Sequence, residues 1–214
     1  MSATSTPVDE SLFAFIARST IAEDDVLREL RLAAAAAGLP EIHIAPEQAA
    51  FLQLVLRASK AKHVVEVGTL GGYSAIAMAR ALPDDGHVIT CEIDPRHAAF
   101  ARERIAASDQ RGRIEVRTGD AAATLSTLSA ESADAMFLDA DKPGYVNYLQ
   151  HAMRILRRGG VLLADNVLAG GDVENGTSQT ARAMRAFLDA ARATPNLRSV
   201  IVPLGDGCLF GVKQ

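Results

Sequence analysis

The amino-acid sequence predicts an α/β fold with a mainly parallel sheet and helices on both of its faces. From Lys62 onward, short apolar runs rich in β-branched residues alternate with helix-like segments, the pattern of a parallel sheet. The chain closes with two short runs joined through Gly205-Asp206-Gly207, a hairpin signal that adds one antiparallel strand. We therefore expect one domain over residues 1–214, with helices over residues 1–58 and the sheet over residues 62–214.

The segment before Lys62 is predicted to be helical, because apolar residues recur there at helix-like spacing. Acidic residues favour the start of the second helix, and glycine followed by proline ends it. Proline also favours the start of the third helix. The expected helices lie around Leu12–Ile16, from Asp24 to Ala37 and from Pro46 to Ala58.

The rest of the chain alternates strands with helices. The expected strands are Val64–Val67, His87–Glu92, Arg113–Arg117, Asp134–Asp139, Gly160–Asp165, Arg198–Pro203 and Cys208–Lys213. The expected helices are Tyr73–Leu82, Pro95–Ala107, a short one through Leu125 and Leu128, Tyr145–Leu156, and Gln179–Ala193.

Charge and composition exclude several classes of protein. The net charge of −4 and scattered cations argue against nucleic acid as a partner. Arg154, Arg157 and Arg158 do cluster, but we expect them to cap the end of a helix. No apolar run reaches the roughly 20 residues of a membrane span. Residues 1–10 lack the basic region and apolar core of a secretory signal, so we expect a cytoplasmic protein that does not bind membranes.

Polar residues gather where the predicted strands end, the edge at which open α/β sheets bind ligands. They lie at residue 92 and within residues 119–121, 139–142 and 165–166, and a glycine loop over residues 68–72 joins them at this edge. Glu92 could accept hydrogen bonds from both hydroxyls of a ribose, as in a nicotinamide-dependent dehydrogenase. Thr69, Leu70 and Tyr73 break the G-x-G-x-x-G pattern of such enzymes, which disfavours that class. A purely structural turn is the simpler alternative for the glycine loop.

Three oxygen-bearing residues at the ends of neighbouring strands indicate a metal site. Asp139, Asp165 and Asn166 supply hard oxygen ligands, which favour Mg²⁺, with Mn²⁺ or Ca²⁺ as alternatives. Asp165-Asn166 alone would more often form a turn or a helix cap. Asp139 on the neighbouring strand makes the metal site the better interpretation.

Two motifs, D-A-D-K-P-G-Y at residues 139–145 and G-G-V-L-L-A-D-N-V-L at residues 159–168, resemble those of the cation-dependent O-methyltransferases. These are the caffeoyl-CoA and catechol O-methyltransferase-like enzymes that use S-adenosyl-L-methionine. The resemblance runs from about Ile42 to Gly207. It implies a Rossmann-like, seven-stranded sheet whose last strand is antiparallel, and a homodimer.

The resemblance also implies roles for individual residues. It implies metal binding by Asp139, Asp165 and Asn166, with Lys142 as general base and Asp139 as its catalytic partner. The implied cofactor-binding residues are Glu66, Gly68, Thr69, Ser74, Glu92, Asp120, Ala121, Asp139 and Asp141.

The predicted function is therefore cation-dependent O-methylation of a small vicinal-dihydroxy aromatic such as a catechol. The alternatives are a metal-independent methyltransferase, a nicotinamide-dependent oxidoreductase and a cofactor-binding protein without turnover. The chain departs from the family at Leu70 and Ile44, and it has no tryptophan. A coenzyme A ester acceptor is therefore not supported, and we expect residues 170–178 to form a mobile loop near the acceptor.

Overall fold

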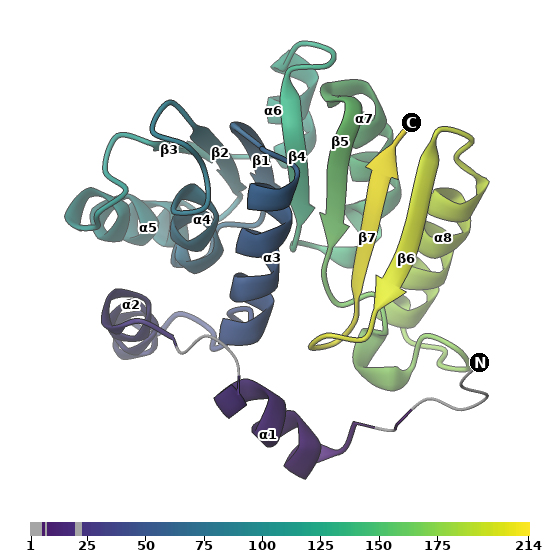
Figure 1. Cartoon of the computed structure of the whole chain (residues 1–214), viewed down its shortest axis with the longest axis horizontal. Helices are drawn as coiled ribbons and strands as arrows, with labels where there is room; N and C mark the ends of the chain where they lie inside the picture. The colour runs from purple at the N-terminus through teal and green to yellow at the C-terminus, as the bar shows by residue number, and fades with distance from the viewer. Residues whose placement is uncertain (1–5, 7, 20–22) are drawn as a thin grey trace.

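A computed structural model describes residue 6, residues 8–19 and residues 23–214 of the chain. Seven strands form one sheet in the order β3-β2-β1-β4-β5-β7-β6 (Figure 1). The strands β1 to β5 pair in parallel, whereas β7 runs antiparallel to both of its neighbours, β5 and β6. The predicted sheet, with its last strand antiparallel, is confirmed. Most of the segment that we searched for a secretory signal lies outside the described residues.

The elements follow the predicted alternation closely. The strands are β1 His63–Val67, β2 His87–Glu92, β3 Ile114–Thr118, β4 Ala133–Leu138, β5 Leu156–Ala164, β6 Leu197–Val202 and β7 Cys208–Lys213. The α-helices are α1 Glu10–Ser19, α2 Asp25–Ala36, α3 Pro46–Ala58, α4 Tyr73–Ala79, α5 Pro95–Ala107, α6 Ala121–Thr127, α7 Tyr145–Ile155 and α8 Gln179–Ala193. Two 3₁₀ turns are η1 Lys142–Gly144 and η2 Ala169–Gly171.

Helices cover both faces of the sheet because the strands are apolar on both sides. Val64 belongs to a core cluster with residues of α2, α3, α4 and α5, whereas its neighbour Val65 belongs to a second cluster with residues of α6, α7 and α8. Alternate residues of a strand point to opposite faces, so one buried strand serves two cores. Both cysteines, Cys91 in β2 and Cys208 in β7, are free and buried.

The N-terminal helices differ in how they contact the sheet and the helices that cover it. Helix α3 buries much of its length against the sheet, and α2 buries Leu27, Leu30 and Ala34. Helix α1 buries none of its residues and lies below the sheet in Figure 1. None of the described helices is long and apolar enough to span a membrane.

The largest difference from the predicted elements is at β5. We expected a helix to Leu156 and a strand from Gly160, but the strand begins at Leu156 itself. Residues 157–160 are inserted between two ladder pairs, Ala133 with Leu156 and Ala135 with Val161, as a bulge in β5. Arg157 therefore pairs with Asp134 instead of capping a helix, and only Arg154 stays in the helix.

Candidate active site

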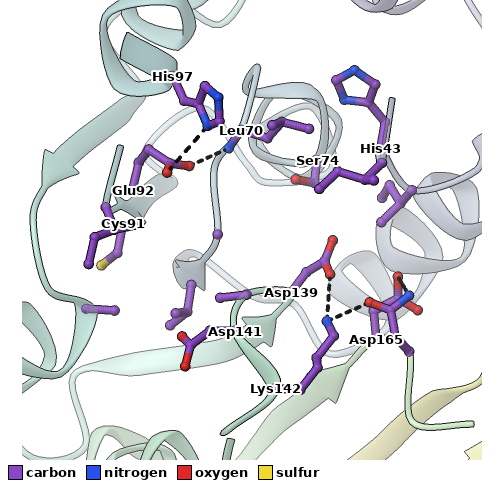
Figure 2. Close-up of a pocket in the computed structure, with 18 of the residues that line it drawn as sticks. His43, Leu70, Ser74, Cys91, Glu92, His97, Asp139, Asp141, Lys142 and Asp165 are labelled. Carbon is purple, nitrogen blue, oxygen red and sulfur yellow. Dashed lines mark hydrogen bonds and ion pairs between the residues drawn. The ribbon is translucent and has the colours of Figure 1, made fainter. Parts of the chain in front are cut away.

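The strand ends meet around one cavity of about 730 Å³, which is within the usual size of a ligand pocket. Backbone hydrogen bonds continue the sheet past its strands and hold these ends together. Asp139 N donates to Val67 O at 2.8 Å, and Asp165 N donates to Leu138 O at 2.9 Å. The cavity lies at the edge that the sequence predicts. Figure 2 shows its wall.

One end of the cavity is built around the carboxylate of Glu92, which is buried. Its Oε2 accepts the N–H groups of Leu70 at 2.7 Å and Thr69 at 3.3 Å, and its Oε1 accepts that of Asp94 at 2.9 Å. The imidazole of His97, at the start of α5, lies 3.8 Å from Oε1 (Figure 2). These contacts fix the carboxylate at the cavity wall, where it could receive ribose hydroxyls.

Glu66 lies behind the wall, fully buried in β1. Its Oε1 accepts the hydroxyl of Ser74 at 2.5 Å, and its Oε2 has no hydrogen-bond partner among the described residues. Burial raises the pKa of this carboxyl to about 8. Ser74 itself lines the cavity, so the pair could reach a positively charged ligand group through the serine.

The opposite end of the cavity carries the predicted metal ligands. The ammonium of Lys142 donates to Asn166 Oδ1 at 2.6 Å and lies 3.4 Å from Asp139 Oδ1 (Figure 2). Burial raises the pKa of Asp139. Burial, followed by the negative charge of Asp139, raises the pKa of Asp165 to about 6. Carboxylate and amide oxygens thus meet around a cationic group.

The three candidate metal ligands, Asp139, Asp165 and Asn166, include no imidazole and no thiolate. No group of three His, Cys, Asp or Glu side chains suited to a metal occurs in the described part of the chain. The third candidate ligand is the amide oxygen of Asn166, which already accepts a hydrogen bond from the Lys142 ammonium. Asn166 has a left-handed backbone, with φ of 58°, a conformation that asparagine tolerates better than most residues.

Two tyrosines of α7 hold Lys142 and Asp141 in place through hydrogen bonds. Tyr145 is fully buried in α7, and its hydroxyl accepts the ammonium of Lys142 at 2.9 Å. Tyr148, one helical turn later, donates its hydroxyl to Asp141 Oδ1 at 2.6 Å. Gly144 N also donates to Asp141, at 3.0 Å. Each tyrosine therefore restrains one residue of the D-A-D-K motif.

The structure brings most of the predicted site residues into the cavity wall. Those lining it are Gly68, Ser74, Glu92, Asp120, Ala121, Asp139, Asp141, Lys142, Asp165 and Asn166. Glu66 and Thr69 lie behind the wall, and the hydroxyl of Thr69 is 2.5 Å from that of Thr90. The backbone N–H of Thr69 is also engaged, since it donates to Glu92 Oε2.

Sequence reasoning missed several residues of the wall. His43 and His97, which we assigned no role from the sequence, both line the cavity, as do Gln48 and Tyr148. Tyr148 had a usable signal, since it lies one turn after Tyr145 on the same helix face. Gln48 had a weaker one, a polar residue within an otherwise apolar helix face.

The loop after Asn166 lies beside the cavity and not in its wall, as far as the described residues go. Its turns are held by side chains from other elements. Asp206 accepts the N–H of Gly170 at 2.9 Å, and Arg185 donates to the carbonyls of Val173 and Gly176, each at 2.9 Å. The expected loop over residues 170–178 is therefore present, outside the cavity wall, and its place near the acceptor stays a prediction.

Comparisons with known proteins agree with this geometry. A family described as O-methyltransferase matches residues 17–214. The chain is 43% identical over 197 residues to a catechol O-methyltransferase of Niastella koreensis, covering 90% of this chain and 87% of that protein. It is 41% identical over 160 residues to a catechol O-methyltransferase of Mycobacterium tuberculosis, covering 75% and 73%.

A solved structure shares the whole architecture. The O-methyltransferase from Bacillus cereus in complex with SAH superposes with a TM-score of 0.89 at 33% identity, covering 95% of this chain and 97% of that one. The family match spans the entire sheet and both ends of the cavity. The chain therefore belongs to the O-methyltransferase family and is an S-adenosylmethionine-dependent O-methyltransferase.

Proposed function

We propose that this enzyme needs a divalent cation and methylates one hydroxyl of a small catechol-like aromatic. The observation that carries the proposal is the group of oxygens around the Lys142 ammonium. Asp139 Oδ1 and Asn166 Oδ1 already face a cation there, and Asp165 lies beside them. Two carboxylates and an amide oxygen suit Mg²⁺, with Mn²⁺ or Ca²⁺ as alternatives. The residues present therefore fit the metal.

The cofactor would be held at the other end of the cavity. Glu92 would accept the ribose hydroxyls, and Asp120 and Ala121 would face the adenine. Ser74, backed by Glu66, would face the methionine part. Gly68 would contribute its backbone, and Thr69 would act through the hydrogen bond from its N–H to Glu92. The carboxylates of Asp139 and Asp141 would complete the wall between the two ends.

The acceptor would lie beside Asp139 and Lys142. A bound divalent cation supplies charge that favours the phenolate form of a hydroxyl and fixes the direction of its oxygen. As a neutral amine, having first released one proton of the ammonium to solvent, Lys142 Nζ would receive the acceptor proton. The new O–C bond would form as the S–C bond of the methyl donor breaks. The hydroxyl of Tyr145 would keep Lys142 in place for that transfer. Orientation of the two reactants would supply much of the rate.

The relatives support a catechol as the acceptor class. Two of them, at 43% and 41% identity, are named catechol O-methyltransferases. Two neighbouring hydroxyls on an aromatic ring can both bind one metal ion, which agrees with three protein ligands that leave positions open. A homodimer and a cytoplasmic location stay predictions.

The test is methylation of a panel of catechols with S-adenosylmethionine, in the presence of Mg²⁺ or of EDTA. We expect turnover that EDTA abolishes and Mg²⁺ restores. Turnover that is indifferent to EDTA would instead support the metal-independent alternative and end the metal proposal.

A variant separates the two ends of the site. Asp165→Ala should abolish methylation and leave binding of S-adenosylhomocysteine nearly unchanged, as measured by calorimetry without metal. Asp189→Ala, which removes an exposed carboxylate of α8, is the control and should keep full activity. Loss of cofactor binding in Asp165→Ala would show that our division of the cavity is wrong.

A further inference from the structure

We infer that Gln48 is a positioning residue that sets the orientation of the Asp165 carboxylate for cation binding. This inference rests on the proposed function, since it concerns the residue that we expect to hold the metal. Gln48 belongs to α3, in the N-terminal extension, and lies 117 positions before Asp165 in the chain. It thus ties that extension to the proposed metal end of the cavity.

The side-chain amide of Gln48 has only one workable orientation. Gln48 is buried in the first turn of α3, and its Oε1 accepts the N–H of Ala45 at 3.1 Å. Its Nε2 on the other side donates to Asp165 Oδ1 at 2.8 Å. A flipped amide would set its oxygen against the carboxylate and its NH₂ against the N–H of Ala45, so the hydrogen-bond partners fix the assignment.

A third contact confines this amide. A Cβ built at Gly205, in the β6–β7 connection, would lie 2.6 Å from Gln48 Cδ and 2.7 Å from its Nε2. The backbone of Gly205 therefore packs directly on the amide, which has no room to rotate toward the connection. Gln48 is held between the N-terminus of α3 and the hairpin, with its N–H groups aimed at Asp165.

This contact decides which way Asp165 points. Oδ1 of Asp165 accepts Gln48, and Oδ2 lies 3.3 Å from Asn166 Nδ2. Each carboxylate oxygen can accept more than one partner, so both can still bind a cation. Without the Gln48 donor, the carboxylate would keep only the longer contact with Asn166, and its orientation would be less restrained. Partners that orient a metal ligand in this way typically change metal affinity by about 10- to 100-fold.

The experiment is titration of Mn²⁺ into the full chain, followed by its electron paramagnetic resonance signal, which reports binding without turnover. Gln48→Met keeps the length of the side chain and removes both hydrogen bonds. We expect it to weaken Mn²⁺ binding about 10- to 100-fold and to leave S-adenosylhomocysteine affinity within about twofold. Gln48→Asn, which keeps an amide that is too short to reach Asp165, should weaken Mn²⁺ binding as well.

The matched control lies on the same helix. Gln53 of α3 also donates its Nε2, to the carbonyl of Ala77 in α4 at 2.9 Å, away from the metal end. Gln53→Met should bind Mn²⁺ like the unaltered protein. Equal Mn²⁺ affinity in both Gln48 variants and the unaltered protein would overturn the inference and leave the metal proposal intact. An unaltered protein that binds no Mn²⁺ would instead overturn the metal proposal itself.

Discussion

Glu66→Gln tests the electrostatics of the cofactor end most directly. Glu66 is fully buried, and one of its carboxylate oxygens lacks a partner among the described residues. Burial, opposed by the hydrogen bond from Ser74, raises its pKa from 4.5 to about 8. The carboxyl is therefore mostly protonated at neutral pH in the cofactor-free protein. Glutamine has the same shape and carries no charge, so it mimics the protonated form.

The sign and size of the effect follow from proton linkage. Because the pKa is higher in the folded state, the folded state binds more protons between pH 4.5 and about 8. Stability is thus fully present below pH 4.5 and is lost as pH rises through about 8. At about 1.4 kcal/mol per pKa unit, the loss is at most about 5 kcal/mol. Glu66→Gln should remove this loss.

The assay is urea unfolding of the cofactor-free protein at several pH values between 5 and about 9. Relative to the unaltered protein, Glu66→Gln should gain several kcal/mol at pH 9 and little at pH 5. Glu103→Gln, an exposed carboxylate of α5, is the control and should leave the pH profile unchanged. A Glu66→Gln protein whose stability still falls between these pH values would refute the assignment of the loss to this carboxyl.

Two further predictions concern single contacts. Lys60 ends α3 with φ of 53°, while the N–H groups of residues 60 and 61 bond back to the carbonyls of 57 and 56. Glycine suits that left-handed position, so Lys60→Gly should raise the free energy of unfolding by about 1 kcal/mol, and an unchanged urea midpoint would contradict this. Tyr148→Phe removes the donor to Asp141 and should weaken S-adenosylhomocysteine binding about tenfold, measured by calorimetry. Unchanged affinity would show that Asp141 needs only the N–H of Gly144.

The elements that the sequence predicts best have local start signals. Helix α5 begins at the expected residue because Asp94 caps it and Pro95 follows, and α8 begins after the capping residue Ser178. The early start of β5 has no such signal. Arg157 enters that strand through a bulge and an ion pair with Asp134, and neither can be read from local propensity.

The residues of the candidate site also fall into those that the sequence could predict and those that it could not. The carboxylates at the ends of parallel strands could be predicted, because strand ends meet at one edge whatever the details of packing. Whether a side chain faces the cavity depends on the exact turn. That is why Glu66 and Thr69 lie behind the wall. The contact of Gln48 with Asp165 joins residues 117 positions apart, and only the folded structure reveals it.

Gly68 links the two ends of the cavity, because its backbone packs directly against that of Asp139. The glycine loop is expected to serve the cofactor, and Gly68 does have a left-handed backbone, with φ of 101°. A Cβ at this position would lie 2.0 Å from the backbone oxygen of Asp139, far inside any allowed contact. Any side chain there would push β1 away from β4 and displace Asp139, the first candidate metal ligand. The glycine that opens this loop therefore also fixes the position of Asp139.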